Sequence, residues 1–292
     1  MRGTHVGVRC AIAACGVVLM AGLTACGSDK SDEGKSGGNG GQSVGSPLAA
    51  LKLASQRTDQ QHSAKVDGTV KSPMANSDMS GAMDWADGMR ANMTMKSKGG
   101  AGASAAGGNK PVNVRYTPDA MFMNAAEMGI PAQGKQWIKY DFDTLAKQGG
   151  PSGAYLKDQM QNNNPSRSVE LLLSTGKVKK VGTEDVRGVE ATHYTGVVKV
   201  SEMARMQSKG MSKSDLDALE KQLKQSGSES ETVDLWIDDK NLLVKKREQA
   251  KSKMGVTDST VFYSDYGTKV TVEEPPASET MDFQKLQQGS QP

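Results

Sequence analysis

The sequence predicts an α+β fold built from antiparallel β-hairpins with a few inserted helices. Apolar and polar residues alternate along most segments after residue 63, which is the pattern of strands with one buried face. Turn sequences that contain glycine or aspartate separate these segments, and helical patterns stand between groups of strands rather than after each strand. Because no regular β/α alternation is present, we expect one sheet partly covered by helices, formed by residues 47–292 as a single domain.

The first half of this domain is expected to contain one helix followed by a run of strands. Ser46 and Pro47 supply an N-cap and a first helical residue, and Leu48 and Leu51 share one face of the predicted helix. Ala86-Asp87-Gly88 is expected to be a hairpin turn, and the Gly/Ala-rich residues 97–110 a mobile loop. The expected strands cover residues 64–70, 83–85, 89–95, 112–116, 121–124 and 137–142.

The second half combines three helical segments with further hairpins. Gly149-Gly150-Pro151 is expected to divide a helical stretch over residues 143–161, and Asn164-Pro165 begins another helix that stops at Gly176. Ser212 or Ser214 caps a third helix. Strands are expected within residues 178–200 and over 232–238, 242–249 and 259–273, after which Pro275-Pro276 should end the sheet and Ser278 should begin a terminal helix.

The N-terminus has the pattern of a bacterial lipoprotein signal peptide. Arg2 and Arg9 precede an apolar run over residues 10–23, which is shorter than the ~20 residues that a membrane-spanning helix needs. Leu23-Thr24-Ala25-Cys26 then resembles the lipobox of bacterial lipoproteins. We therefore expect cleavage after residue 25 and a diacylglyceryl group, with a possible additional N-acyl chain, on Cys26.

Lipid on Cys26 would hold the protein on the extracytoplasmic face of the cell membrane. Stable anchoring takes about two acyl chains, which one diacylglyceryl group supplies. The other cysteines, Cys10 and Cys15, lie in the signal peptide, so no thiol is left for a disulfide or a nucleophile. Residues 26–46 comprise the lipidated cysteine and a Gly/Ser-rich segment, which is expected to be a flexible tether with a reach of roughly 25 Å.

Composition and motifs argue against an enzyme or a nucleic-acid-binding protein. The chain has 36 basic and 33 acidic residues, and Arg2 and Arg9 leave with the signal peptide, so the mature chain is close to neutral. Only His62 and His193 follow the signal peptide, and the carboxylates are scattered as on a solvated surface. The motif from Gly129 to Lys135 fits a phosphate-binding loop in spacing, but Gln136 replaces the required Ser/Thr and a strand pattern follows. We predict no catalytic residue, metal or cofactor.

Methionine is the most informative residue type in the mature chain. All but two of the 17 methionines follow the signal peptide, and several fall at period-two positions that place them on one face of the predicted sheet. Methionine is flexible and polarizable, so it suits surfaces that adapt to apolar ligands, although the same residues also fill irregular cores. We identify five candidate ligand-binding residues, with core packing and an exposed face as the alternatives: Met83, Met93, Met95, Met121 and Met123.

Several short motifs resemble actinobacterial lipoproteins of the group that contains LppX and LprG. They are Leu173-Ser-Thr-Gly176, the segment from Val186 to Tyr194, Leu235-Trp-Ile-Asp238 with the segment from Leu242 to Lys246, and Tyr263-Ser-Asp-Tyr-Gly267. This resemblance implies a LolA-like fold, in which a strongly curved antiparallel sheet forms a half-barrel with helices packed on its concave face. The chain departs from that group in its Gly/Ala-rich loop and its many methionines.

The resemblance and the lipobox together predict a membrane-anchored protein that binds or carries lipid. Its partners would be the membrane, through Cys26, and lipids, glycolipids or acylated proteins held between sheet and helices. The chain is expected to be a monomer that binds no nucleic acid. The alternative is a lipid-anchored protein-interaction or envelope-sensing module with no lipid ligand.

Overall fold

The computed structural model describes residues 46–73, 76–99, 110–207 and 212–289. The strands in this part of the chain are β1 (Ser63–Lys71), β2 (Asn76–Asp84), β3 (Arg90–Gly99), β4 (Pro111–Tyr116), β5 (Ala120–Asn124), β6 (Trp137–Asp141), β7 (Lys179–Val186), β8 (Val189–Lys199), β9 (Ser230–Asp238), β10 (Leu243–Ser252), β11 (Gly255–Ser264) and β12 (Thr280–Asp282). The helices are α1 (Pro47–Asp59), α2 (Ala125–Met128), α3 (Phe142–Gln161), α4 (Pro165–Ser174), α5 (Val200–Gln207), α6 (Lys213–Gln225) and α7 (Phe283–Gly289).

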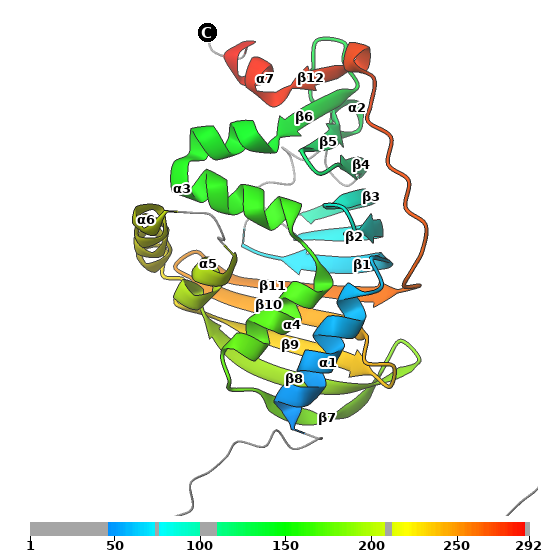
Figure 1. The fold of residues 1–292 in the computed structure, drawn as a ribbon. Helices are drawn as coiled ribbons and strands as arrows, with labels where there is room; N and C mark the ends of the chain where they lie inside the picture. The colour runs from blue at the N-terminus through cyan, green and yellow to red at the C-terminus, as the bar shows by residue number, and fades with distance from the viewer. Residues whose placement is uncertain (1–45, 74–75, 100–109, 208–211, 290–292) are drawn as a thin grey trace, which may run out of the picture. The chain divides into compact units, whose positions relative to one another are not determined.

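All of these strands belong to one open sheet with the order β12-β6-β5-β4-β3-β2-β1-β11-β10-β9-β8-β7. Neighbouring strands are antiparallel except for β12 and β6, and β1 joins the N-terminal and C-terminal groups of hairpins by pairing with both β2 and β11. The predicted α+β class with a single, mainly antiparallel sheet is therefore confirmed, and Figure 1 shows the sheet curving around the helices in front of it.

The expectation that Pro275-Pro276 would end the sheet was wrong. After β11 the chain passes the ends of the neighbouring strands without pairing with them (Figure 1). The side chains of Asn92 and Arg115 hold this segment by donating hydrogen bonds to the carbonyl oxygens of Thr271 and Glu273. The chain then adds β12, which pairs with β6 in parallel. Strand β12 has only three residues, so its alternation of apolar and polar side chains is too short to identify a strand from the sequence.

Helices α1 and α4 pack on one face of the sheet through their apolar residues, and each begins at a capped N-terminus. Ser46 and Asn164 accept hydrogen bonds at the N-termini of α1 and α4, as predicted. These two helices lie side by side over β8, β9 and β10 (Figure 1). Their apolar residues Leu51, Val169 and Leu172 are completely buried against the sheet, and they form the centre of the main core.

Helix α3 is divided in the way the sequence predicts. Gly150 has φ 56° and ψ −139°, which is not helical and is accessible mainly to glycine, and Pro151 begins the second segment. The two segments cross the sheet in different directions in Figure 1. The second segment, after the kink, brings its side chains over the middle of the sheet, where the candidate site lies.

Helices α2 and α5 were not predicted, and some of the predicted features fall on residues outside the described part of the chain. The strand expected to reach Val200 ends at Lys199, where α5 begins without a turn sequence, and α2 is a single short turn after β5. The predicted signal peptide, Cys26, the predicted tether up to residue 45 and most of the predicted loop at 97–110 lie outside the described residues, and residues 97–99 of that loop belong instead to β3. Within them, no helix is long and apolar enough to cross a membrane.

Candidate ligand-binding cavity

A cavity of about 470 Å³ lies between the middle of the sheet and helices α3, α4 and α5. This volume falls in the range of small-molecule sites, roughly 300–1,000 Å³. Methionine is its most frequent lining residue, contributed by β2, the turn between β2 and β3, β3, α3 and α5. The lining methionines are Met79, Met83, Met89, Met93, Met95, Met160 and Met203.

Strand register explains why so many methionines meet here. In the β2–β3 hairpin, Met79 lies opposite Met95 and Gly81 lies opposite Met93, so their side chains project from the same face. Gly81 leaves space for its neighbour, because a Cβ at this position would lie 2.1 Å from the Asn92 carbonyl oxygen and 2.9 Å from Met93 Sδ. The hairpin thus presents an apolar, deformable surface to the helices.

The structure brings three of the five predicted methionines to this cavity. Met83, Met93 and Met95 line it. Met121 and Met123 project from the same face, since Met123 lies opposite Val114 and Val114 opposite Met93. Both are instead packed with Phe142 of α3 in a separate core cluster. The alternation of residues along a strand predicts the sheet face from which a side chain projects. The helices above that face decide whether the side chain is packed in a core or borders a cavity.

The cavity also has lining methionines that were not predicted, and they include two kinds. Met79 stands four residues before Met83 in the same strand, and this spacing could have revealed it, but the surrounding Ser, Asp and Gly residues hid the strand. Met160 and Met203 come from helices, and only the tertiary structure places them against the hairpin.

The wall opposite the methionines is polar and charged. Lys246 is only 9% exposed, and its Nζ donates hydrogen bonds to Ser168 Oγ and Glu248 Oε1, each at 3.2 Å. Ser168 Oγ in turn donates to Glu248 Oε1 at 2.9 Å. Burial acts to lower the pKa of Lys246, but Glu248, together with Tyr263 and Glu231, outweighs it and holds that pKa above its usual range. Lys246 is therefore a permanently charged group of the cavity.

Glu231 adds a second carboxylate to this wall. Loss of solvation, and then the charge of Glu248, raises the pKa of Glu231 to about 7, while Lys246 acts in the opposite direction. Lys246, Glu248 and Glu231 occupy alternate positions on the helix-covered face of β10 and β9. The expectation that the scattered carboxylates lie on a solvated surface is therefore wrong for Glu231 and Glu248, because helices cover the face from which they project.

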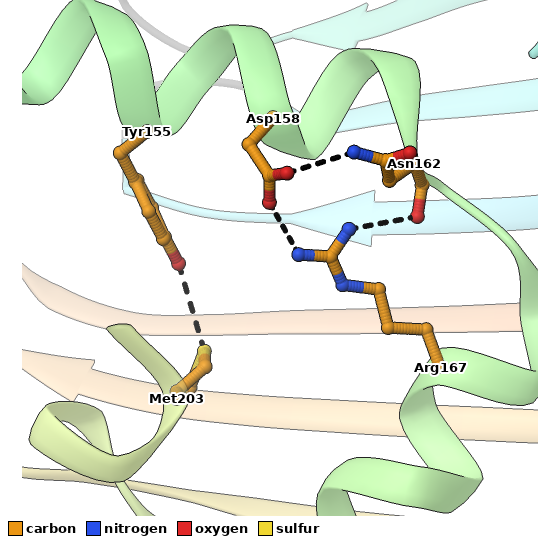
Figure 2. A network of polar contacts seen from close by, with 5 residues as sticks. All are labelled: Tyr155, Asp158, Asn162, Arg167 and Met203. Carbon is orange, nitrogen blue, oxygen red and sulfur yellow. Dashed lines mark hydrogen bonds and ion pairs between the residues drawn. The ribbon is translucent and has the colours of Figure 1, made fainter. Parts of the chain in front are cut away.

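A polar network joins the helices over the cavity (Figure 2). Arg167 of α4 forms an ion pair with Asp158 of α3, and its Nη1 donates a hydrogen bond to the Asn162 carbonyl oxygen at 3.1 Å. Tyr155 Oη, also on α3, donates to Met203 Sδ of α5 at 3.7 Å. Burial is the main cause that raises the pKa of Tyr155 to about 12, so its hydroxyl is protonated at neutral pH. The network ties α3 to α4 and α5 with neutral or paired groups.

A second hollow, of about 910 Å³, is larger but chemically different. It borders the loops at one end of β8 to β11 and is lined by charged residues such as Arg187, Lys240 and Asp265, and none of its described lining residues is a methionine. The methionine-lined cavity is the stronger candidate because it combines an apolar wall with a few convergent polar groups.

The histidine singled out in the sequence has a structural environment. His193 Nε2 lies 2.9 Å from Asp234 Oδ1, and the ring stacks on Trp236 with centroids 4.2 Å apart. Among the described residues, no group of three or more His, Cys, Asp or Glu side chains is arranged to hold a metal ion. The absence of an enzyme activity or cofactor stays a prediction.

Comparison with known proteins identifies the family. No family model matches the chain. An uncharacterized 31.2 kDa protein of Streptomyces griseus is 44% identical over 249 residues, covering 84% of this chain and 81% of that protein. SCO4650 of Streptomyces coelicolor, which carries the name of a lipoprotein, is 33% identical over 247 residues, covering 83% of this chain and 77% of its own length. The chain belongs to this actinobacterial lipoprotein family.

Among solved structures, the lipoprotein is similar to two mycobacterial lipoproteins. LppX of Mycobacterium tuberculosis has a TM-score of 0.48 at 13% identity, with 77% of this chain and 97% of LppX covered. LprF of Mycobacterium bovis has a TM-score of 0.45 at 16% identity, with 78% of this chain and 96% of LprF covered. The family assignment rests on the two Streptomyces relatives, and it agrees with the predicted resemblance to actinobacterial lipoproteins.

Proposed function

We propose that this lipoprotein binds acylated molecules at the outer face of the cell membrane and holds an acyl chain in the methionine-lined cavity. The observation that carries the proposal is the cavity itself, with one wall of methionines and an opposite wall of buried polar groups. An acyl chain buried against the methionines gains about 25 cal/mol per Å² of apolar surface. The polar wall is suited to hold the head of the same molecule.

The predicted anchor on Cys26 would keep this cavity beside its source of ligand. A protein tethered to a membrane meets lipids, glycolipids and acylated proteins at high effective concentration. The lipoprotein therefore needs only modest affinity to exchange such molecules with the membrane. We infer that it acts as a monomeric carrier or store, with no covalent chemistry.

Mass spectrometry of non-covalently bound lipid tests the proposal. The full chain, purified from an actinobacterial host, is extracted with organic solvent, and a defined acylated species in constant ratio to protein is expected. Met93→Gln and Met79→Gln should weaken retention about 5- to 100-fold, because an amide placed against the acyl chain costs roughly 1–3 kcal/mol. Met79 is the cleaner test, since it lines the cavity but is in none of the core clusters.

Met123→Gln is the matched control. Met123 is half-buried on the same sheet face as Met93 but does not line the cavity, so retention should stay within about twofold of the parent protein. A folded parent protein that carries no lipid would contradict the proposal and favour a protein-interaction module. Equal loss of lipid in all three variants would show that retention reflects stability rather than contact.

A further inference from the structure

The polar wall of the cavity contains a carboxylate whose charge is not matched. Among the described residues, two cations line the cavity, and both are engaged: Lys246 with Glu248 and Ser168, and Arg167 with Asp158. In the described part of the chain, no hydrogen bond or ion pair joins the Glu231 carboxylate to another group. A polar group left without a partner in a partly desolvated site favours any ligand that supplies one.

Glu231 is placed where the head of a bound acyl chain would lie. It projects from the same sheet face as Glu248, because Glu231 lies opposite Ala250 and Glu248 opposite Val233, which is completely buried. Both carboxylates line the same cavity as the methionines of β2 and β3. A chain that occupies the methionine wall would therefore bring its head to the carboxylates.

The charge of this wall selects among headgroups. A phosphate or carboxylate would meet Glu231 and Glu248 together, and the two nearby cations are already paired, so an anionic head is disfavoured. A hydroxyl or ammonium group can donate a hydrogen bond to Glu231 and introduces no like charge.

Resting on the function proposed above, we propose that the cavity selects acylated molecules whose head donates hydrogen bonds and carries no negative charge, with Glu231 as the specificity-determining residue. Hydroxyl and ammonium heads share this chemistry. Of the two, an ammonium head depends on the charge of Glu231, whereas a hydroxyl head requires only a hydrogen-bond acceptor, which glutamine also offers.

Competition among twelve-carbon probes tests this selection. The full chain is saturated with a fluorescent acyl probe, which is then displaced by monolaurin, dodecylamine or dodecyl phosphate, each kept below its micelle concentration. Monolaurin, dodecylamine or both should displace at about tenfold lower concentration than dodecyl phosphate. Because the chains are identical, any difference arises at the head, and the stronger competitor tells whether hydroxyl or ammonium is preferred.

Glu231→Gln connects the selection to this residue. It should reduce the advantage of dodecylamine over dodecyl phosphate about 5- to 10-fold and leave monolaurin within about twofold. Glu229→Gln is the matched control, since Glu229 is exposed, two residues away and outside the lining, and it should change nothing. An unchanged melting temperature at the assay pH, or a raised one, shows that the substituted proteins are folded.

The advantage of dodecylamine over monolaurin should also grow between pH 6 and pH 8 as Glu231 ionises, because neither of these two heads changes its charge in that interval. The groups that face Glu231 are Lys246 and Glu248 on β10, Arg167 with Asp158, Tyr155 on α3 and Tyr263 on β11. Lys246, Tyr155 and Tyr263 keep their protons in this interval, because the pKa of each is raised above an already high ordinary value. If all probes bind equally, or if Glu231→Gln has no effect, the proposed headgroup selection is wrong, but the proposal that the cavity binds an acyl chain is not contradicted. If no probe displaces and the fluorescent probe itself fails to bind, the proposed function is wrong.

Discussion

Individual residues of this lipoprotein combine two opposite requirements in one cavity. The flexible methionine side chains form an apolar wall that can adapt to a ligand. In contrast, Lys246, Glu248 and Glu231 place charges in a part of the cavity that is shielded from solvent. Lys246 and Glu248 satisfy each other, but Glu231 does not share in their hydrogen bonds. The unmatched carboxylate should therefore reduce the stability of the empty protein at the pH where it is charged.

Glu231→Gln is expected to stabilise the empty protein at alkaline pH. The folded-state pKa of Glu231 is raised to about 7 from 4.5, so the unfolded chain releases this proton first as the pH rises. Glu231 thus lowers stability progressively between about pH 4.5 and 7, and its cost is constant above that range. Relative to the parent protein, the variant should gain about 1–3 kcal/mol of unfolding free energy at pH 8 that is absent at pH 4.5.

Urea unfolding at the two pH values measures this difference, with Glu229→Gln as the exposed control. A gain of the same size at pH 4.5 and pH 8 would contradict the assignment, because it would come from packing or hydrogen bonding rather than from titration. A gain found in both variants would reflect net charge alone.

Among the helices and strands, α3 most directly connects backbone conformation with the cavity. Its second segment supplies Tyr155 and Met160 to the lining, and the direction of that segment is set at Gly150. The preceding Gly149 lies within the same helical stretch, and a Cβ at either glycine would meet open space. Substitution effects at the two glycines therefore report on backbone conformation and not on steric contact.

Gly150→Ala is expected to destabilise the protein by about 1–3 kcal/mol, because its φ of 56° with ψ of −139° is strained for any residue with a Cβ. Gly149→Ala should be neutral or stabilising by up to about 1 kcal/mol, since alanine is the better helix former. Chemical denaturation measures both values. If the two substitutions had equal effects, the kink would not depend on the special conformation of Gly150.

At the scale of the whole molecule, the lipoprotein family and the predicted anchor imply one measurable property. Cys26→Ser should move the protein from the membrane fraction to the soluble fraction, because about two acyl chains are needed for stable attachment and the substitution removes their site. Fractionation of cells that express each protein, with detection by immunoblot, measures the change. The neighbouring Thr24→Ser keeps the cysteine and serves as control, and membrane retention of Cys26→Ser would contradict lipidation at this residue.

The order of the elements could be predicted because it depends on local signals. Alternation identified the hairpins, Ser46 and Asn164 identified helix starts, and Gly150-Pro151 identified the kink. Signals of this kind act over a few residues, so a single sequence contains them. Helix α5 and strand β12 were missed because one starts without a turn and the other depends on its pairing with β6.

By itself, the sequence determined the α+β class, the order of most strands along the chain and the sheet face that carries the strand methionines. Only the tertiary structure decided that Met83, Met93 and Met95 border an open cavity while Met121 and Met123 are packed beneath α3. It also decided that Glu231 and Glu248 are covered rather than solvated. The physical reason is that period two specifies the direction of a side chain, whereas burial depends on which helix lies above it.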